Sequence, residues 1–375
     1  MIPLSLYIHL PWCVRKCPYC DFNSHPLKTE LPEQRYIQAL LQDISYDLPL
    51  VKNRRISSIF LGGGTPSLFS PDALFQLFAQ LRLRIPFEKN IEITLEANPA
   101  TAEISKFAGF YQTGINRLSL GVQSFNDQSL QNIQRIHHRQ HAIDAIEMLK
   151  KVGFKNFNLD LMYGLPNQTL EMALDDLKMA LHFQPTHLSW YQLTLEKNTY
   201  FDRYPPHLPD ENIIWEMQMA GEQLLREKNY EHYEISAFTK KQHYCRHNLN
   251  YWQFGDYLGI GAGAHSKITL SSNRVLRLSK HKHPDFYLQS SHKIAERLEV
   301  SHENLAFEFM LNALRLCQGF DKSLFYQRTG LTLDIINQPL QQAIEKGWLI
   351  CKNSRIMPTE NGLKWLNELL ELFLV

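Results

Sequence analysis

The sequence predicts an α/β protein: a partial (β/α)6 barrel, an irregular extension and a C-terminal winged-helix-like domain. Up to about residue 200, short β-rich runs alternate with longer helical patterns, and the β-rich runs are almost continuously apolar. Strands of that kind are buried on both faces, as they are when helices cover a parallel sheet or when a barrel closes them. Repeated β/α units predict parallel strands, in a sheet that is either open or curved into a partial barrel.

The expected strands cover residues 4–10, 56–62, 91–97, 116–122, 156–162 and 187–193. The helical patterns between them cover residues 33–48, 71–83, 101–112, 126–152 and 169–183. The second of these helices has the clearest start, because Ser70 is a good N-cap and Pro71 suits the first turn.

The regular alternation fades after about residue 200, and we expect three domains, at 1–240, 241–298 and 299–375. The middle segment reads as irregular and aromatic-rich, with a hairpin at 267–278 whose turn is "SSN". The last combines helical patterns with a strand–turn–strand, which is typical of a winged helix. Such units usually bind DNA, but its third helical pattern, 334–346, has few Lys or Arg, so we expect no nucleic-acid partner.

Composition excludes several classes of protein. With 375 residues, 44% hydrophobic and 21% charged, the chain has ample material for a core, and its net charge of +1 selects neither a polyanion nor a membrane surface. The start "MIPLSLYIHLPW" lacks a basic region, and no run of about 18 apolar residues occurs, so we expect neither a signal peptide nor a membrane span. Because the remaining cysteines, Cys245, Cys317 and Cys351, are scattered, we expect a reduced cytoplasmic protein.

Three clustered cysteines, Cys13, Cys17 and Cys20, form a C-x3-C-x2-C pattern directly after the first strand. A zinc site with His9 or His25 as fourth ligand and a redox dithiol are the plainer interpretations. Zinc sites usually add a distant second pair of thiols, which does not follow here, and a dithiol needs only C-x-x-C. We favour a [4Fe–4S] cluster, because three thiolates leave one iron with the open position that chemistry requires.

Further candidates lie at the ends of later strands, where barrel enzymes place their chemistry. The "GGGT" turn lets a ligand approach the backbone closely, although by itself it could be a plain tight turn. Glu96 ends the third strand, where it could bind a ligand or serve in a structural ion pair. Gln123 ends the fourth strand, Arg135 follows in the next helix, and the fifth strand presents Asp160.

The cysteine loop, with Tyr19 before its last cysteine, resembles the radical S-adenosylmethionine (SAM) superfamily. There the free iron chelates the amino and carboxylate groups of SAM, and the reduced cluster cleaves SAM to a 5′-deoxyadenosyl radical. The segments "YIHLPWC", "GGGTPS", "LEANP", "GVQSF" and "DLMYGLP" resemble the branch of oxygen-independent coproporphyrinogen III oxidases and their relatives. This resemblance implies that Cys13, Cys17 and Cys20 hold the cluster. It implies SAM contacts from Tyr7, Tyr19, Gly63, Gly64, Thr65, Glu96, Gln123, Arg135 and Asp160.

Two departures separate the chain from those oxidases. Phe22 stands where they carry a fourth cysteine, and twelve residues precede Cys13, without the N-terminal extension of those enzymes. The segment "HNLNYW" instead resembles the H-N-x-x-Y-W mark of the HemW-type haem chaperones. Imidazole is a common haem ligand and Tyr and Trp offer flat apolar surface, so we expect His247 to ligate haem from a surface loop.

Plainer interpretations of this segment stay open. A histidine beside Tyr and Trp is often an ordinary packed residue, and His243, Cys245 and His247 could form a small zinc or haem–thiolate site. The turn "GIGAGAHS", which contains His265, either lines the open end of the barrel or only closes the fold.

The resemblance implies a haem chaperone that uses a [4Fe–4S] cluster and SAM without coproporphyrinogen oxidase activity. Its implied partners are haem, recipient haem proteins such as membrane respiratory enzymes, and a second copy of the chain. It would work in the cytoplasm or peripherally at the membrane. The alternative is an oxygen-independent coproporphyrinogen III dehydrogenase, which the set of SAM residues supports. A third hypothesis is a radical SAM enzyme acting on another substrate. Whether SAM is cleaved productively is left open.

Overall fold

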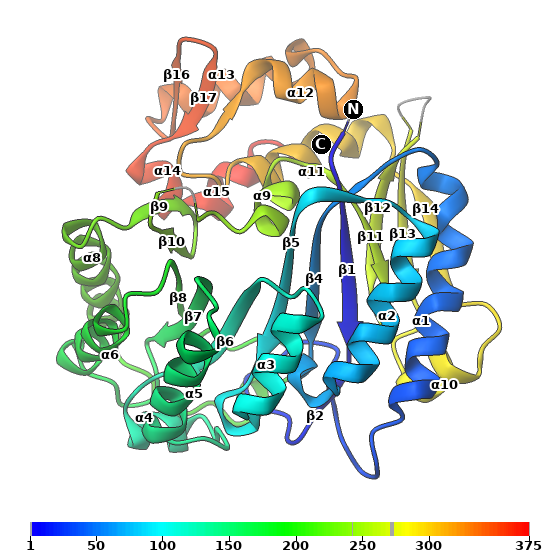
Figure 1. The fold of residues 1–375 in the computed structure, drawn as a ribbon. Coiled ribbons are helices and arrows are strands. Elements are labelled where there is room, and N and C mark those ends of the chain that lie inside the picture. Colours follow the sequence, from blue (N-terminus) through cyan, green and yellow to red (C-terminus); the bar gives the residue numbers. More distant parts are fainter. Residues whose placement is uncertain (1, 242, 271–273, 375) are drawn as a thin grey trace.

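The computed structural model describes residues 2–241, 243–270 and 274–374. Figure 1 shows a strongly curved sheet with helices on its outer face and a small unit at its upper end. In this view the arrow of β1 points downward, so the carboxyl ends of the parallel strands lie at the lower end, near β2 (Trp12–Cys13). The N-terminus and the C-terminal unit lie at the upper end.

Parallel strands form the middle of the sheet, and they confirm the predicted partial (β/α)6 barrel. In spatial order they are β1 (Leu4–Leu10), β4 (Ile56–Gly63), β5 (Phe87–Ala97), β6 (Arg117–Gln123), β7 (Asn156–Tyr163) and β8 (His187–Gln192). A further parallel strand, β11 (Asp256–Ile260), pairs with the other side of β1. The sequence does not predict β11, which lies in a segment expected to be irregular.

Antiparallel strands extend the sheet on both sides. Beyond β8 lie β10 (Ala237–Thr239) and β9 (Glu231–Glu234), and beyond β11 lie β12 (His265–Thr269), β13 (Val275–Lys280) and β14 (Ile294–Glu299). β12 and β13 pair as the hairpin pattern predicts, while the expected turn residues 271–273 lie outside the described part of the chain. Since β14 and β9 are its two edges, the sheet is curved but not closed.

Helices cover the outer face of the parallel strands (Figure 1). They are α1 (Glu33–Asp47), α2 (Pro71–Arg84), α3 (Ile104–Gln112), α4 (Asp127–Asn132), α5 (Arg139–Val152), α6 (Leu170–His182) and α8 (Glu211–Glu227). The short helix α7 (Tyr200–Arg203) lies beside the cysteine loop, where the Phe201 amide donates to the Pro18 carbonyl. α2 begins as predicted, because Ser70 Oγ accepts a hydrogen bond from the Ala73 amide at 3.2 Å. The expected helix 126–152 is two helices, since the backbone turns at Gln134, where φ is +54°.

The amino ends of the parallel strands are covered by α9 (Arg246–Trp252), which packs against β1, β4 and β11. Glu92 of β5 accepts hydrogen bonds from the first amides of this helix, at 2.9 Å from Arg246 and 3.4 Å from His247. A carboxylate at a helix N-terminus is favourable because it pairs with unsatisfied amides. The helix therefore has a defined place at the floor of the barrel.

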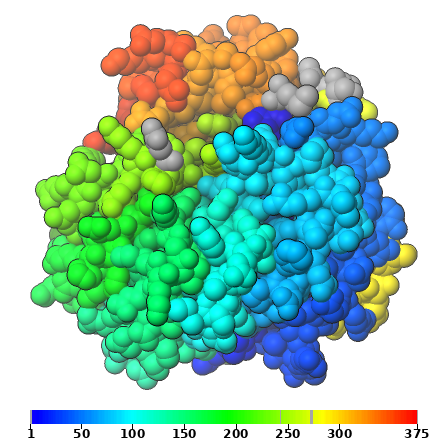
Figure 2. Space-filling model, in the orientation of Figure 1, coloured from blue at the N-terminus to red at the C-terminus, as the bar shows by residue number. Residues whose placement is uncertain are grey.

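The C-terminal unit sits on this same end (Figures 1 and 2). After α10 (Pro284–Gln289) the chain forms α11 (His302–Ala313), β15 (Phe320–Asp321), α12 (Lys322–Thr329), α13 (Asn337–Glu345), β16 (Leu349–Lys352), β17 (Arg355–Pro358), α14 (Glu360–Lys364) and α15 (Leu366–Glu371). These helices and the small antiparallel sheet β15–β17–β16 form the winged-helix-like unit that the sequence predicts. Because Phe309, Phe320 and Phe325 belong to a core separate from that of the barrel, we propose 299–375 as the domain.

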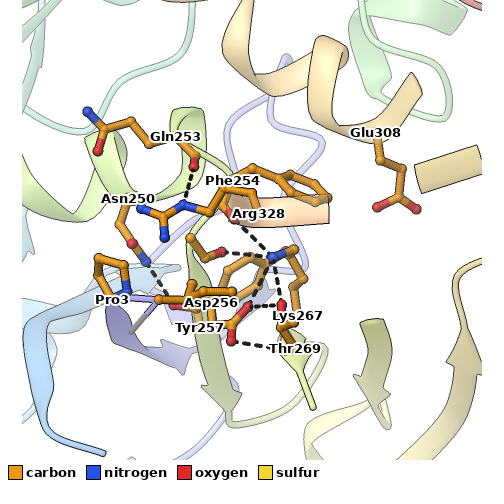
Figure 3. A network of polar contacts seen from close by, with 12 residues as sticks. Pro3, Asn250, Gln253, Phe254, Asp256, Tyr257, Lys267, Thr269, Glu308 and Arg328 are labelled. Carbon is orange, nitrogen blue, oxygen red and sulfur yellow. Dashed lines mark hydrogen bonds and ion pairs between the residues drawn. The ribbon is translucent and has the colours of Figure 1, made fainter. Parts of the chain in front are cut away.

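Buried charges join the unit to the barrel (Figure 3). Asp256, at the start of β11, binds Lys267 of β12 at 3.0 Å and Arg54 at 2.7 Å. Lys267 also donates to the carbonyl of Phe254, whose ring belongs to the core of the C-terminal unit, and Arg328 of α12 donates to the carbonyl of Gln253. No helix in the described residues is long and apolar enough to cross a membrane.

Candidate functional site

A cavity of about 780 Å³ opens at the carboxyl ends of the parallel strands. Its walls come from β1, from the cysteine loop, from the ends of β4 and β5 and from the turn before β12. From the inner wall, Tyr7, His9, Gly63, Glu96 and Tyr251 face this space, together with Cys20 of the loop. The volume is that of a typical pocket for a cofactor or small molecule.

The three cysteines lie on the loop that follows β1, and they are partly exposed free thiols. Burial raises the pKa of the Cys13 and Cys20 thiols, and each is raised further by neighbouring thiols. Arg135 donates to Cys17 Sγ at 3.5 Å and so ties the loop to the region after β6. Three accessible thiols on one loop, within electrostatic reach of one another, suit the donor chemistry of an iron–sulfur cluster.

The histidines considered as fourth zinc ligands are engaged elsewhere. His9 donates through Nε2 to the Asn23 carbonyl at 2.9 Å and bonds Tyr7 through Nδ1 at 3.0 Å. His25 bonds the side chain of Asn23 at 3.2 Å. Across the described residues, no group of three His, Cys, Asp or Glu side chains lies close enough together to hold a single metal ion.

The glycine turn after β4 packs tightly against β1 and the cysteine loop. Gly63 has φ of +114°, and a Cβ there would lie 2.5 Å from the ring of His9. A Cβ on Gly64 would lie 2.4 Å from the carbonyl oxygen of Trp12. The Gly64 and Thr65 amides donate to the carbonyls of Leu10 and Trp12. The turn needs glycine at both positions, because any side chain would push the cysteine loop away.

Glu96 is the carboxylate of the inner wall. Its Oε2 accepts a hydrogen bond from the Gly63 amide at 3.3 Å. Burial raises the pKa of Glu96 to about 8, and the nearby Asp160 carboxylate raises it further. Burial likewise raises the pKa of the Tyr7 phenol. The inner wall therefore presents a carboxyl and a phenol that are largely protonated at neutral pH.

The structure brings some of the expected SAM residues to the cavity and leaves others behind its wall. Tyr7, Gly63 and Glu96 line it, whereas Gly64, Thr65, Tyr19, Gln123, Arg135 and Asp160 do not. Gln123 has φ of +67° and accepts a hydrogen bond from Tyr191 at 2.9 Å. Asp160 accepts hydrogen bonds from Ser119 and Asn158, so it belongs to a polar layer inside the barrel.

His247 lies at the opposite end of the barrel, and the expectation of a surface loop is wrong. Its side chain belongs to α9 and is 2% exposed. Nδ1 bonds Ser58 Oγ at 3.3 Å, and the ring packs 5.1 Å from that of Phe60 and 4.9 Å from that of Tyr251. Nε2 has no hydrogen-bond partner among the described residues. His247 is buried because Glu92 holds the N-terminus of α9 and these rings pack around the imidazole.

Cys245, two residues before the motif, is similarly buried. The Cys245 thiol is 1% exposed and lies 3.8 Å from Glu92, and burial raises its pKa to about 12. Burial lowers the pKa of His247 to about 3, and the positive charge of Arg117 lowers it further. His247 is therefore neutral at physiological pH.

Most of the outer wall of the cavity is not predicted by the sequence. Three loops far apart in the sequence lie with His265 around the opening. They carry Lys16 and Phe22, Lys197, and Lys282. Among these segments, the sequence indicates only the turn that contains His265 as a candidate for the open end of the barrel. The lysines carry no motif, so no pattern in the sequence could have joined them.

Comparisons with known proteins agree with the fold. The model of the Radical SAM superfamily matches residues 7–180, and that of the HemN C-terminal domain matches residues 300–365. In the solved structure of coproporphyrinogen III oxidase (HemN) from Escherichia coli, a radical SAM enzyme, 90% of the chain matches 99% of this one with a TM-score of 0.85. The identity is 23%, so this likeness shows the fold alone.

Curated relatives match along the whole chain. Heme chaperone HemW of Haemophilus influenzae is 50% identical over 376 residues, which covers 99% of this chain and 98% of the relative. Heme chaperone HemW of Escherichia coli is 47% identical over 372 residues, with the same coverage. The mitochondrial Radical S-adenosyl methionine domain-containing protein 1 of Bos taurus is 31% identical over 98% of this chain and 86% of its own. The chain therefore belongs to the HemW family of the radical SAM superfamily.

Proposed function

We propose that this protein is a haem chaperone, which binds haem and transfers it to recipient haem proteins without coproporphyrinogen oxidase activity. The observation that carries the proposal is the similarity over 99% of the chain to proteins named heme chaperone HemW, at 50% and 47% identity. Phe22, where the oxidases carry a fourth cysteine, supports the same assignment.

A [4Fe–4S] cluster and SAM are the proposed cofactors. The three thiols of the cysteine loop supply the cluster ligands, and the tight glycine turn holds this loop beside the inner wall. When bound, the cluster and SAM supply one-electron chemistry. The chain itself offers the Glu96 carboxylate, the Gly63 backbone and the Tyr7 phenol to a polar ligand. The full proposed set for SAM is Tyr7, Tyr19, Gly63, Gly64, Thr65, Glu96, Gln123, Arg135 and Asp160.

His247 is the proposed haem ligand, and its ligation requires a change of conformation. Its neutral imidazole and its unpartnered Nε2 are what an axial haem ligand needs. In this conformation Tyr7 and Tyr251 line the cavity and pack against His247, so their rings separate it from the open space. Ligation by His247 therefore requires these rings, or α9 as a whole, to move.

The further partners are proposals that rest on the family resemblance. They are membrane respiratory enzymes as recipients and a second copy of the chain in a homodimer. The proposed location is the cytoplasm, with peripheral contact at the membrane.

Haem titration of the purified, anaerobically reconstituted protein tests the function. We expect stoichiometric retention of haem after desalting, seen as Soret absorbance, and transfer of that haem to an apo-haem protein such as apomyoglobin. Coproporphyrinogen III should not be consumed in an anaerobic assay with SAM and a reductant. Absence of retention together with release of carbon dioxide would replace the chaperone with the dehydrogenase.

The His247→Ala variant tests the ligand separately, with His302→Ala, which is exposed at the start of α11, as its control. Loss of retention in His247→Ala alone supports ligation, provided that the circular dichroism spectrum is unchanged. Equal retention in both variants would make His247 a packing residue of the barrel floor.

A further inference from the structure

The outer part of the cavity has a composition that differs from its inner wall. The inner wall carries Glu96, Tyr7 and the glycine turn. Around the opening lie an exposed imidazole, an exposed phenyl ring and three lysines, which are His265, Phe22, Lys16, Lys197 and Lys282. None of these outer residues belongs to the proposed cluster or SAM set.

His265 presents an imidazole that is available to a ligand. It begins β12 with an exposed side chain, and within the described residues its ring nitrogens make no hydrogen bond. The other cavity-lining histidines, His9 and His25, are already bonded through Asn23. Partial burial lowers the pKa of His265, and the charges of Lys282 and Arg277 lower it further, which favours the neutral ring that binds metals.

The lysines give the opening a positive charge. Lys16, Lys197 and Lys282 are exposed, and in the described part of the chain none of them forms an ion pair with a carboxylate. The acidic residues of the lining are Asp21 and the deeper Glu96, whose pKa near 8 leaves it mostly protonated at neutral pH. An anionic ligand would therefore meet more positive than negative charge.

Phe22 adds a flat apolar surface at the same opening. Its side chain is 57% exposed beside the cysteine loop, although phenylalanine is usually buried. The Lys16 ammonium donates to the Phe22 carbonyl at 3.0 Å, so the aromatic ring and one cation lie on the same short loop. The ring therefore offers a ligand in the opening a flat apolar face to pack against.

The two sides of the opening are held together by Asn23. Its amide nitrogen donates to the Ala262 carbonyl at 2.9 Å and to the Lys282 carbonyl at 2.8 Å. A Cβ on Gly263 would lie 2.3 Å from that nitrogen, so the close approach depends on glycine, whose φ is +80°. The loop with Lys16 and Phe22 is thereby fixed relative to the segment with His265 and Lys282.

We propose that this opening is a haem site distinct from His247. The macrocycle packs on Phe22, the carboxylates of the propionates pair with the lysines, and the His265 imidazole ligates the iron. An apolar planar body, two carboxylates and a metal that accepts imidazole are the features that these residues match together. The inference rests on the proposed function, because it names the site at which the chaperone takes up its haem.

Three related ligands distinguish the contacts to the macrocycle, to the propionates and to the iron. They are haem, haem dimethyl ester, which lacks free carboxylates, and protoporphyrin IX, which lacks iron. Equilibrium titrations would use the cluster-reconstituted full-length protein and the variants His265→Ala, Lys282→Glu and Phe22→Ala. The exposed residues His302 and Lys155, changed to Ala and Glu respectively, are the controls.

His265→Ala should weaken haem at least about tenfold and shift the Soret band, since loss of ligand-shell groups costs metal sites about 10–100-fold. It should leave protoporphyrin IX unchanged, and added imidazole should restore the haem spectrum. Lys282→Glu should weaken haem and protoporphyrin IX about five- to tenfold but not the dimethyl ester. Phe22→Ala should weaken all three ligands.

The outcomes keep the inference apart from the proposed function. If wild-type protein binds haem while His265→Ala and Lys282→Glu match their controls, the site at the opening is overturned and the chaperone stands. If wild-type protein retains no haem, the proposed function itself fails. Equal weakening of haem and its dimethyl ester by Lys282→Glu would also contradict the inference, because the lysine would then not act on the carboxylates.

Discussion

At the carboxyl ends of its strands the barrel is open, and at the amino ends it is closed by α9 and the C-terminal unit. Each end contains a fully buried lysine that binds aspartate. At the open end, Lys280 lies 2.6 Å from Asp43 and 2.7 Å from Asp47. At the closed end, Lys267 lies 3.0 Å from Asp256. Both lysines come from the same hairpin, β12–β13. The two ends differ in the segments that these buried charges hold in place.

The open-end cluster supports the turn that carries His265. Asp43 accepts hydrogen bonds from the Gly261 amide at 3.1 Å and from Tyr287 at 2.7 Å. The closed-end cluster holds β11 in the sheet and contacts the C-terminal unit, as Figure 3 shows. Similar buried ion pairs therefore hold the turn that carries His265 at one end of the barrel and a contact between domains at the other.

The largest expected effects come from breaking these clusters, and at the open end from Lys280→Met. Two buried carboxylates would be left without their cation, and removal of one partner from a buried pair costs about 3–5 kcal/mol. We expect the free energy of urea unfolding to fall by that amount and haem affinity to fall as the turn with His265 loosens. Lys178→Met, which removes an exposed pair with Asp175, should cost under about 1 kcal/mol.

At the closed end, Asp256→Asn strands Lys267 and Arg54 and should lower the free energy of unfolding by a similar amount, about 3–5 kcal/mol. Haem affinity of the folded fraction should stay within about twofold of wild type, because the opening is at the other end of the barrel. Urea unfolding and haem titration on the same preparations give both numbers. A similar loss of haem binding in both variants would mean that the two ends are coupled, and it would contradict their separate roles.

Much of the open end could be predicted from sequence because its signals are local. Apolar runs gave the parallel strands, and the cysteine spacing and the "GGGT" turn marked the loops at their carboxyl ends. The closed end depends on contacts between distant residues, such as Glu92 with the amides of α9. The "HNLNYW" segment was therefore read as a loop, although its polar residues face a polar barrel floor. The lysines of the opening escaped for the same reason, since only the fold brings their loops together.

A smaller effect concerns the pH dependence of stability at the open end. Burial raises the pKa of Asp47 to about 6, against the opposing charge of Lys280. Because the folded pKa lies above the unfolded value of about 3.9, the native state binds more protons between these values. Stability is thus highest below pH 4 for this group and is lost as pH rises through 6, by about 1–3 kcal/mol.

Asp47→Asn removes this contribution, so its unfolding free energy should vary less than that of wild type between about pH 4 and pH 7. Chemical unfolding at several pH values checks this, with the exposed Asp175→Asn as control. Identical pH profiles for Asp47→Asn and wild type would show that Lys280 keeps Asp47 ionised throughout, and the open-end cluster would then resemble the closed-end one, where Asp256 has a lowered pKa.

The smallest effect tests the inner wall itself, through Glu96. Its pKa of about 8 means that the carboxyl must lose a proton before both of its oxygens can accept hydrogen bonds from the amino group of SAM. We therefore expect SAM affinity of the cluster-reconstituted protein to rise about tenfold per pH unit below pH 8 and to level off above it, since one pKa unit corresponds to about 1.4 kcal/mol.

Isothermal titration calorimetry at several pH values measures this slope, and buffers of different ionisation enthalpy report the released proton. Glu96→Gln should bind SAM weakly with a flat profile, and the exposed Glu103→Gln should follow wild type. Parallel slopes in wild type and Glu96→Gln would assign the proton to another group. Glu96 would then be a structural acid bound to the Gly63 amide. It would resemble Glu92 at the closed end, which accepts hydrogen bonds from the amides of α9.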